Sequence, residues 1–126
     1  MIYDSAAAAL SRAPSVSLPK MTVAYDLYGA KDLGLLSAKV NVERTLGEAL
    51  EERDSSYQGG VYYMLGGGDA ENFVLKLNID SFDGDAVEEN YPDYTVLLYI
   101  NATDRSFALE RIMRQAGFKL LRHEVF

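Results

Sequence analysis

The alternation of apolar and polar residues predicts most of the secondary structure of this 126-residue chain. From Lys20 to Gly29, successive residues alternate between two faces with a period of two. Four apolar residues share one face of this segment: Met21, Val23, Tyr25 and Leu27. The other face holds Thr22, Ala24, Asp26 and Tyr28. This alternation is typical of a half-buried strand that ends at the glycine.

Two further segments indicate a hairpin, and a third indicates a central strand. Residues 61–65 are apolar or β-favouring, and residues 73–79 show the clearest period-two alternation in the chain, with a Gly-rich turn at 66–69 between them. We therefore expect an antiparallel hairpin. Residues 94–100 are apolar on both faces except for Thr95, which is typical of a strand covered on both sides. This strand should lie in the middle of the sheet.

Helical spacing appears in three places. Asp4 or Ser5 can cap a short helix over 5–12, and a second helix is expected over 43–53, with a capping box at Thr45–Glu48. The third helix begins after a cap at Thr103 or Asp104 and ends at Gly117 in a left-handed conformation. Its Schellman ending predicts a contact between Phe118 and Met113, and residues 119–126 follow as a closing strand.

These elements predict a single α+β domain over residues 1–126. Its sheet is mainly antiparallel with about five strands, and two or three helices pack largely on one face. A ferredoxin-like topology with an added strand is compatible with this order of elements.

Composition and charge narrow the function classes. The net charge is −7 and the pI about 4.6, which argues against binding a nucleic-acid backbone and favours a basic partner. The chain has no Cys and one His, so no metal site or cofactor is predicted. The Ala6–Leu10 run lacks the flanks of a signal peptide, and no segment is long enough to span a bilayer, so we expect a soluble, cytoplasmic protein.

The strongest candidate site is the acidic segment 80–93, which carries six carboxylates and no Lys or Arg. The residues expected to bind a partner are Phe82, Asp83, Asp85, Glu88, Glu89, Tyr91 and Asp93. Several carboxylates steer encounter with a cation, and the two aromatic residues supply apolar anchors. The alternative is a solvated connection that keeps the protein soluble. A calcium loop is disfavoured because Ile79 and Asn90 occupy positions that need carboxylates.

Other chemistry-bearing residues have simpler structural explanations. Residues 66–69 form a turn without the Lys-Ser/Thr pair of a phosphate loop. Ser55, Ser56 and His123 supply the residue types of a hydrolytic triad without a nucleophile-elbow context, so His123 is expected to be a surface or capped residue. The nine tyrosines, Tyr57 among them, fit strand packing, and they can also border a pocket or an interface. We therefore expect a protein that is not an enzyme.

Two segments, Arg53–Tyr63 and Tyr91–Tyr99, resemble small bacterial immunity proteins of polymorphic-toxin and contact-dependent growth inhibition systems. The resemblance covers about residues 45–125. It implies a cytoplasmic, non-enzymatic inhibitor that binds one cognate toxin domain, often a nuclease, and blocks it. No toxin-contact residue carries over from the family.

Three functions stay open at this point. The first is an immunity protein that occludes the active site of a basic toxin. The second is a ferredoxin-like module that binds a small molecule at a sheet edge or a dimer interface, which predicts a closed pocket lined by tyrosines and a symmetric dimer. The third, an enzyme using carboxylates alone, requires two carboxyl groups facing each other in a cleft. The oligomeric state is left open.

Overall fold

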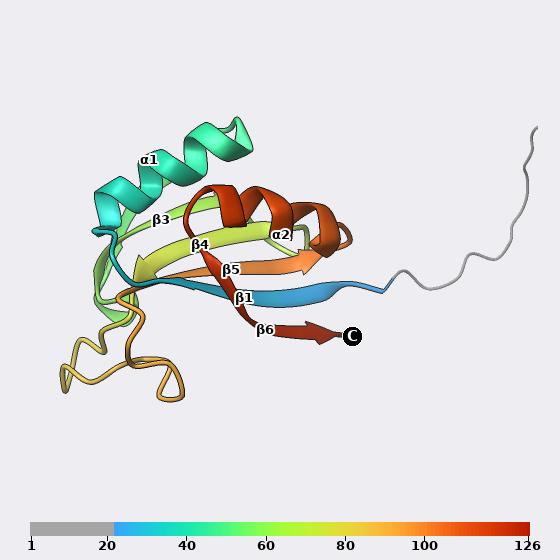
Figure 1. Ribbon diagram of the computed structural model, residues 1–126. Helices are drawn as coiled ribbons and strands as arrows, with labels where there is room; N and C mark the ends of the chain where they lie inside the picture. The colour runs from blue at the N-terminus through green and yellow to red at the C-terminus, as the bar shows by residue number, and fades with distance from the viewer. Residues whose placement is uncertain (1–21) are drawn as a thin grey trace, which may run out of the picture.

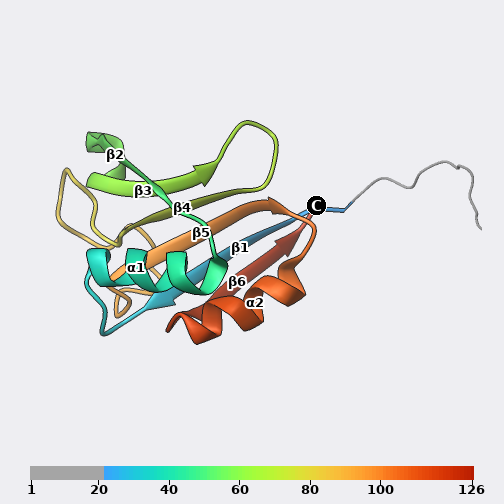
Figure 2. The same cartoon turned by 90° about the horizontal axis from the view of Figure 1, so that it is seen from above.

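The computed structural model describes residues 22–126. Its central feature is one antiparallel sheet of six strands. In chain order the elements are β1 (Ala24–Ala30), α1 (Leu35–Leu46), β2 (Glu51–Ser55), the 3₁₀ turn η1 (Ser56–Gln58), β3 (Gly60–Gly66), β4 (Asn72–Leu77), β5 (Val96–Thr103), α2 (Ser106–Gln115) and β6 (Lys119–Val125). The strands lie in the order β2-β3-β4-β5-β1-β6. Both helices cover one face of the sheet (Figure 1, Figure 2).

The predicted α+β class and antiparallel sheet are confirmed, with six strands in place of about five. The hairpin is β3–β4, and the strand expected at the centre is β5, which lies between β4 and β1. Val96, Leu97 and Leu98 are fully buried, so β5 is covered on both faces as expected. The helix expected over 5–12 lies outside the described residues.

The predicted helix over 43–53 and its capping box are wrong. Helix α1 ends at Leu46, because Gly47 takes a left-handed conformation with φ 81°. Thr45 donates its hydroxyl back to the carbonyl of Asn41 instead of capping a new helix. The Glu43 carboxylate accepts the backbone N–H of Leu50 at 2.7 Å, which turns the chain into β2 and holds the pKa of Glu43 below its ordinary value.

The two ends of α2 differ in how well the sequence predicted them. The C-terminal end is the expected Schellman motif, in which Phe118 N–H donates to Met113 O at 2.9 Å and Gly117 has φ 95°. The predicted N-terminal cap at Thr103 or Asp104 is wrong, because α2 begins after Arg105 and no side chain caps it. The Thr103 hydroxyl donates to Glu71 and accepts the N–H of Arg105.

The two faces of β1 are reversed relative to the sequence prediction. Ala24, Asp26 and Tyr28 were assigned to the more polar face, yet all three are buried, and Tyr28 belongs to the core beneath the helices. The other face also contributes a buried residue, Leu27, whereas Tyr25 is 39% exposed. Strand β1 is therefore buried on both faces over part of its length, because a second layer covers the sheet there.

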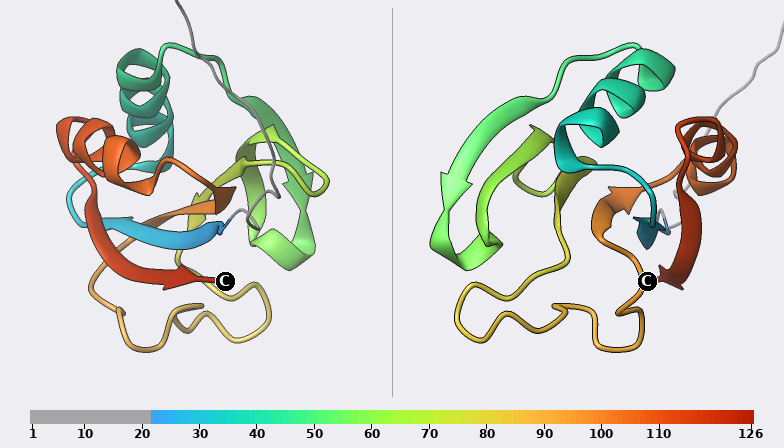
Figure 3. Two further views of the ribbon diagram at one scale, coloured as in Figure 1. Left: turned by 90° about the vertical axis from the view of Figure 1, so that its right-hand side faces the viewer. Right: turned by 60° about the vertical axis from the view of Figure 1, so that its left-hand side comes forward.

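That second layer is the segment between β4 and β5. It lies on the side of the sheet opposite the helices, here named the helix-free face (Figure 1, Figure 3). A Cβ added to Gly29 would lie 2.8 Å from the ring of Tyr94 and 2.7 Å from Leu121, which shows how closely this layer packs. The acidic segment 80–93, named the acidic loop below, is therefore part of the packed structure.

Candidate functional site

Asn78 organises the acidic loop from within. It is 5% exposed, and its amide nitrogen donates to the carbonyls of Tyr91 at 3.0 Å and Tyr94 at 2.9 Å. Its side-chain oxygen accepts the backbone N–H of Glu88 at 2.9 Å. One buried side chain thus pairs three backbone groups of the loop, which fixes the loop conformation.

Two aspartates shape the tip of the acidic loop. Asp80 accepts the N–H of Phe82 at 2.7 Å, and Asp83 accepts the N–H of Asp85 at 2.9 Å. The backbone N–H of Asp80 also donates to the carbonyl of Asp85 at 2.7 Å. These are local Asx turns, which explain why this carboxylate-rich stretch forms an ordered structure.

Glu88 ties the acidic loop to the helix-free face. Its carboxylate accepts the Tyr99 hydroxyl at 2.5 Å and an N–H of Arg122 at 3.0 Å. Burial raises the pKa of Glu88, but the hydrogen bonds from Tyr99 and Arg122, together with the positive charges of Arg122 and Lys76, outweigh burial and hold that pKa below its ordinary value. Glu88 is therefore engaged within the fold instead of facing a partner.

Tyr91 is also used within the fold. Its hydroxyl donates to the carbonyl of Leu121 on β6 at 2.9 Å, and its ring meets the ring of Tyr94 edge-on at 6.4 Å. The Lys31 ammonium lies 4.9 Å from the centre of the Tyr94 ring. The remaining five residues expected to bind a partner are exposed: Phe82, Asp83, Asp85, Glu89 and Asp93.

Tyr57 was considered only as one of several tyrosines that could border a pocket or an interface, and it was not assigned to the acidic loop, to which the fold brings it. The Ser81 hydroxyl donates to the carbonyl of Ser56 at 2.6 Å, so η1 and the loop are joined. Tyr57 and Phe82 are 85% and 81% exposed. We name the acidic–aromatic surface as the six exposed residues Tyr57, Phe82, Asp83, Asp85, Glu89 and Asp93. The available signal was Tyr57 itself, an aromatic residue between polar neighbours and glycines.

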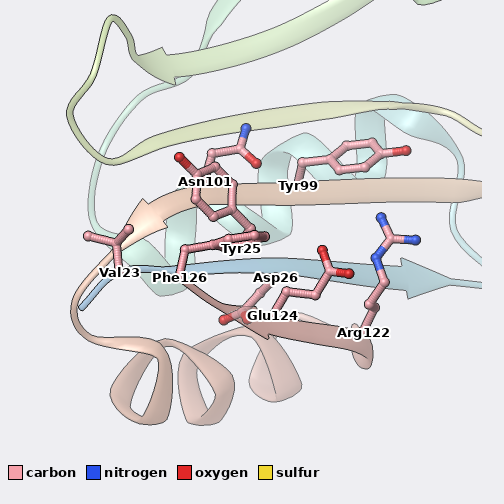
Figure 4. A pocket seen from close by; sticks show the side chains of 8 residues that line it. All are labelled: Val23, Tyr25, Asp26, Tyr99, Asn101, Arg122, Glu124 and Phe126. Carbon is pink, nitrogen blue, oxygen red and sulfur yellow. The ribbon is translucent and has the colours of Figure 1, made fainter.

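A cavity of about 480 Å³ lies on the part of the helix-free face that the acidic loop leaves open. Its lining residues come from β1, β5, β6 and their flanks: Val23, Tyr25, Asp26, Tyr99, Asn101, Arg122, Glu124 and Phe126 (Figure 4). The rings of Tyr25 and Phe126 meet edge-on at 5.3 Å. Tyr25 and Tyr99 thus border a pocket, which was one of the roles considered for the tyrosines.

His123 lies beside Asp26 on the face that carries the helices. The His123 Nδ1 atom is 2.5 Å from a carboxylate oxygen of Asp26, whose side chain is 1% exposed. Ser55 instead accepts the N–H of Tyr57, and Ser55 and Ser56 lie at the β2 edge, opposite the β6 edge that holds His123. These three residues therefore form no triad.

No group of three or more His, Cys, Asp or Glu side chains within residues 22–126 is arranged to hold a metal ion. Neither α1 nor α2 is long and apolar enough to cross a membrane.

Comparisons with known proteins add no family assignment. The chain matches no protein-family model, no curated protein and no solved structure.

Proposed function

We propose that the chain is an immunity-type binding protein that neutralises a basic toxin domain, such as a nuclease effector, by occluding its active site. The observation that carries this proposal is the acidic–aromatic surface. Two aromatic side chains, Tyr57 and Phe82, project into solvent beside carboxylates that lack a basic partner within the described residues. Exposed aromatic anchors of this kind supply much of the binding energy at protein interfaces.

Charge and order both support a protein partner. A nuclease active site is basic because it holds phosphate, so an acidic cover is complementary to it and speeds association. The hydrogen bonds of Asn78, Asp80 and Asp83 hold the loop before any partner arrives. Little conformational entropy is then lost on binding, which favours affinity.

The fold in this proposal is a ferredoxin-like unit. The elements β1-α1-β4-β5-α2-β6, with spatial order β4-β5-β1-β6, have the connections of that fold. Strands β2 and β3 are then an insertion that extends the sheet by two strands instead of one. The insertion brings η1 and Tyr57 beside the acidic loop, so it supports the same surface.

The test begins with purification of the tagged chain from its native host and identification of the protein retained with it. The association rate with that protein is then measured for the unchanged chain and for the triple variant Asp85→Lys, Glu89→Lys, Asp93→Lys, whose carboxylates are exposed and make no hydrogen bond within the described residues. We expect a basic partner whose activity the chain inhibits. Association should slow by about tenfold at low salt in the variant and lose most of its salt dependence.

The matched control reverses three exposed acids elsewhere, in the variant Glu48→Lys, Asp69→Lys, Asp104→Lys. If association slows equally in both variants, the slowing results from the change in net charge alone, and the acidic–aromatic surface is removed from the proposal. An acidic partner, or a partner whose activity is unaffected, would contradict the function itself. Glu88 is left unchanged because its carboxylate holds the fold.

The second candidate function is a small-molecule-binding module of ferredoxin-like type. The observation that favours it is the cavity of about 480 Å³ bordered by Tyr25, Tyr99 and Phe126. The cavity is open where a closed pocket was expected. Sedimentation with and without ligand tests the symmetric dimer that this function predicts.

A further inference from the structure

The cavity on the helix-free face is built by two neighbouring rows of side chains. Tyr25 on β1 pairs with Glu124 on β6, and Leu27 on β1 pairs with Arg122 on β6 and with Tyr99 on β5. Figure 4 shows Tyr25, Tyr99, Arg122 and Glu124 rising from these three strands. The strands set the spacing of these groups, so the cavity presents a fixed arrangement of polar atoms and rings.

The charge of this cavity is set by Glu124. The guanidinium of Arg122 is already paired with Glu88 at 3.0 Å, so its charge is balanced within the fold. The carboxylate of Asp26 is buried, and one of its oxygens lies 2.5 Å from His123 Nδ1. Glu124, by contrast, is exposed and has no ion pair within residues 22–126. Glu124 therefore gives the cavity a negative charge that no ion pair within residues 22–126 balances.

The uncharged lining groups also favour a cation. Asn101 donates its amide to Asn72 at 3.0 Å, so its own carbonyl oxygen stays available as an acceptor. Tyr25, Tyr99 and Phe126 supply aromatic rings, whose negative faces attract cations. An anion would have to displace Glu88 from both Tyr99 and Arg122. Its binding would leave that carboxylate, which is 17% exposed, without partners.

From these contacts we infer that the cavity binds a small organic cation with a guanidinium, amidinium or ammonium group, held by Glu124 and Asn101 and stacked on the aromatic rings. This inference rests on the second candidate function and names its ligand class. The cavity volume lies within the range of about 300–1,000 Å³ that is common for small-molecule sites.

The test uses three probes of one shape and different charge: benzamidinium, benzamide and benzoate. Each is titrated into the full chain while backbone amide resonances are followed by NMR. We expect saturable binding of benzamidinium, with shifts concentrated on β1, β5 and β6. Benzamide should bind at least about tenfold more weakly, because the charge-assisted hydrogen bond is lost, and benzoate should not bind.

Two variants locate the site. Glu124→Gln should weaken benzamidinium binding at least about fivefold without changing the melting temperature, because Glu124 is exposed and unpaired within the described residues. Its control, Glu52→Gln on the opposite edge strand, should leave binding unchanged. Asp83→Asn with Asp85→Asn should also leave it unchanged, which excludes attraction to the acidic loop.

The outcomes separate the inference from the function on which it rests. Equal binding of benzamide, or binding of benzoate in the cavity, would overturn the cation inference and leave the small-molecule candidate standing. If none of the three probes shifts the cavity resonances, both fail. If benzamidinium binding persists in Glu124→Gln, the assigned carboxylate is wrong and the inference fails.

Discussion

The helix-free face has two halves that differ in what covers them. In the covered half, Lys76, Leu97 and Gly29 lie side by side on β4, β5 and β1 and are buried under the segment between β4 and β5. In the open half, Tyr25 and Glu124 of neighbouring strands are exposed and border the cavity. The same strands supply both halves, so the length and anchoring of one loop decide which half becomes core and which stays available to a ligand.

Glu88 lies at the boundary between the two halves. It belongs to the loop that covers one half, and it pairs with Arg122 and Tyr99, which line the cavity in the other. In the covered half, burial lowers the pKa of Lys76, while the charges of Asp80 and Glu88 oppose that shift. The loop thus covers apolar residues and also supplies the carboxylates that balance the cations beneath it.

The largest effect is expected for Asn78→Ala, which removes the internal organiser of the loop. Three backbone groups lose their partner, so the free energy of unfolding should fall by about 3 kcal/mol. Amide exchange should accelerate across the acidic loop. Chemical denaturation with hydrogen exchange measures both. The control Asn90→Ala, an exposed position in the same loop, should change stability by less than about 0.5 kcal/mol.

Adding a methyl group to the tightly packed covered half should cause the next largest loss of stability. In Gly29→Ala the new methyl group would lie 2.7 Å from Leu121 and 2.8 Å from the Tyr94 ring. We expect a loss of about 1–3 kcal/mol, measured by thermal unfolding. Gly67→Ala is the control, since a Cβ there meets nothing within 4 Å. Equal stability of both variants would contradict the close packing of this half.

The variant Glu88→Gln tests how much the Glu88 contacts at the boundary contribute to stability, and how that contribution depends on pH. The pKa of Glu88 in the folded chain is lower than its ordinary value of 4.5. The ionised carboxylate therefore adds its full contribution to the free energy of unfolding above pH 4.5, and this contribution is lost as the pH falls through the lowered pKa. We expect the variant to be about 1–2 kcal/mol less stable at pH 7, with the two curves converging in acid. Denaturant titrations at several pH values measure this. Glu89→Gln, at an exposed neighbour, should follow the unchanged chain throughout.

The smallest effect is expected in the open half. Phe126 is 72% exposed and meets Tyr25 edge-on, so Phe126→Ala should cost about 0.5 kcal/mol. Thermal unfolding measures it. A loss as large as that of Gly29→Ala would show that the open half is packed as tightly as the covered half, and the comparison between them would fail.

Local sequence signals predicted the parts of the fold that depend on local interactions. The alternation in β4, the apolar run of β5 and the Gly117 ending of α2 each occur within a few residues. The sequence analysis missed β2 because Glu51–Ser55 carries no apolar alternation and becomes a strand by pairing with β3. It reversed the faces of β1 because Asp26 is buried against His123, far along the chain.

The sequence likewise predicted only part of the candidate site. The acidic loop was recognised from composition, and five of its seven expected residues are exposed. The internal roles of Glu88 and Tyr91 depend on Arg122 and Leu121, which the fold alone brings near. Tyr57 joins the surface through a hydrogen bond between Ser81 and Ser56, and no local pattern indicates that contact.

The position of β1 inside the sheet has a consequence for how the chain folds during its synthesis. Residues 24–30 pair only with residues 96–103 and 119–125, which leave the ribosome much later. Strands β2, β3 and β4 can meanwhile pair with one another, since they are close in sequence. One edge of β1 therefore stays without its native partner until residues 96–103 are made, and the other edge until residues 119–125 are made. We expect the nascent chain to be most prone to aggregation before β5 is available, when both edges are unpaired.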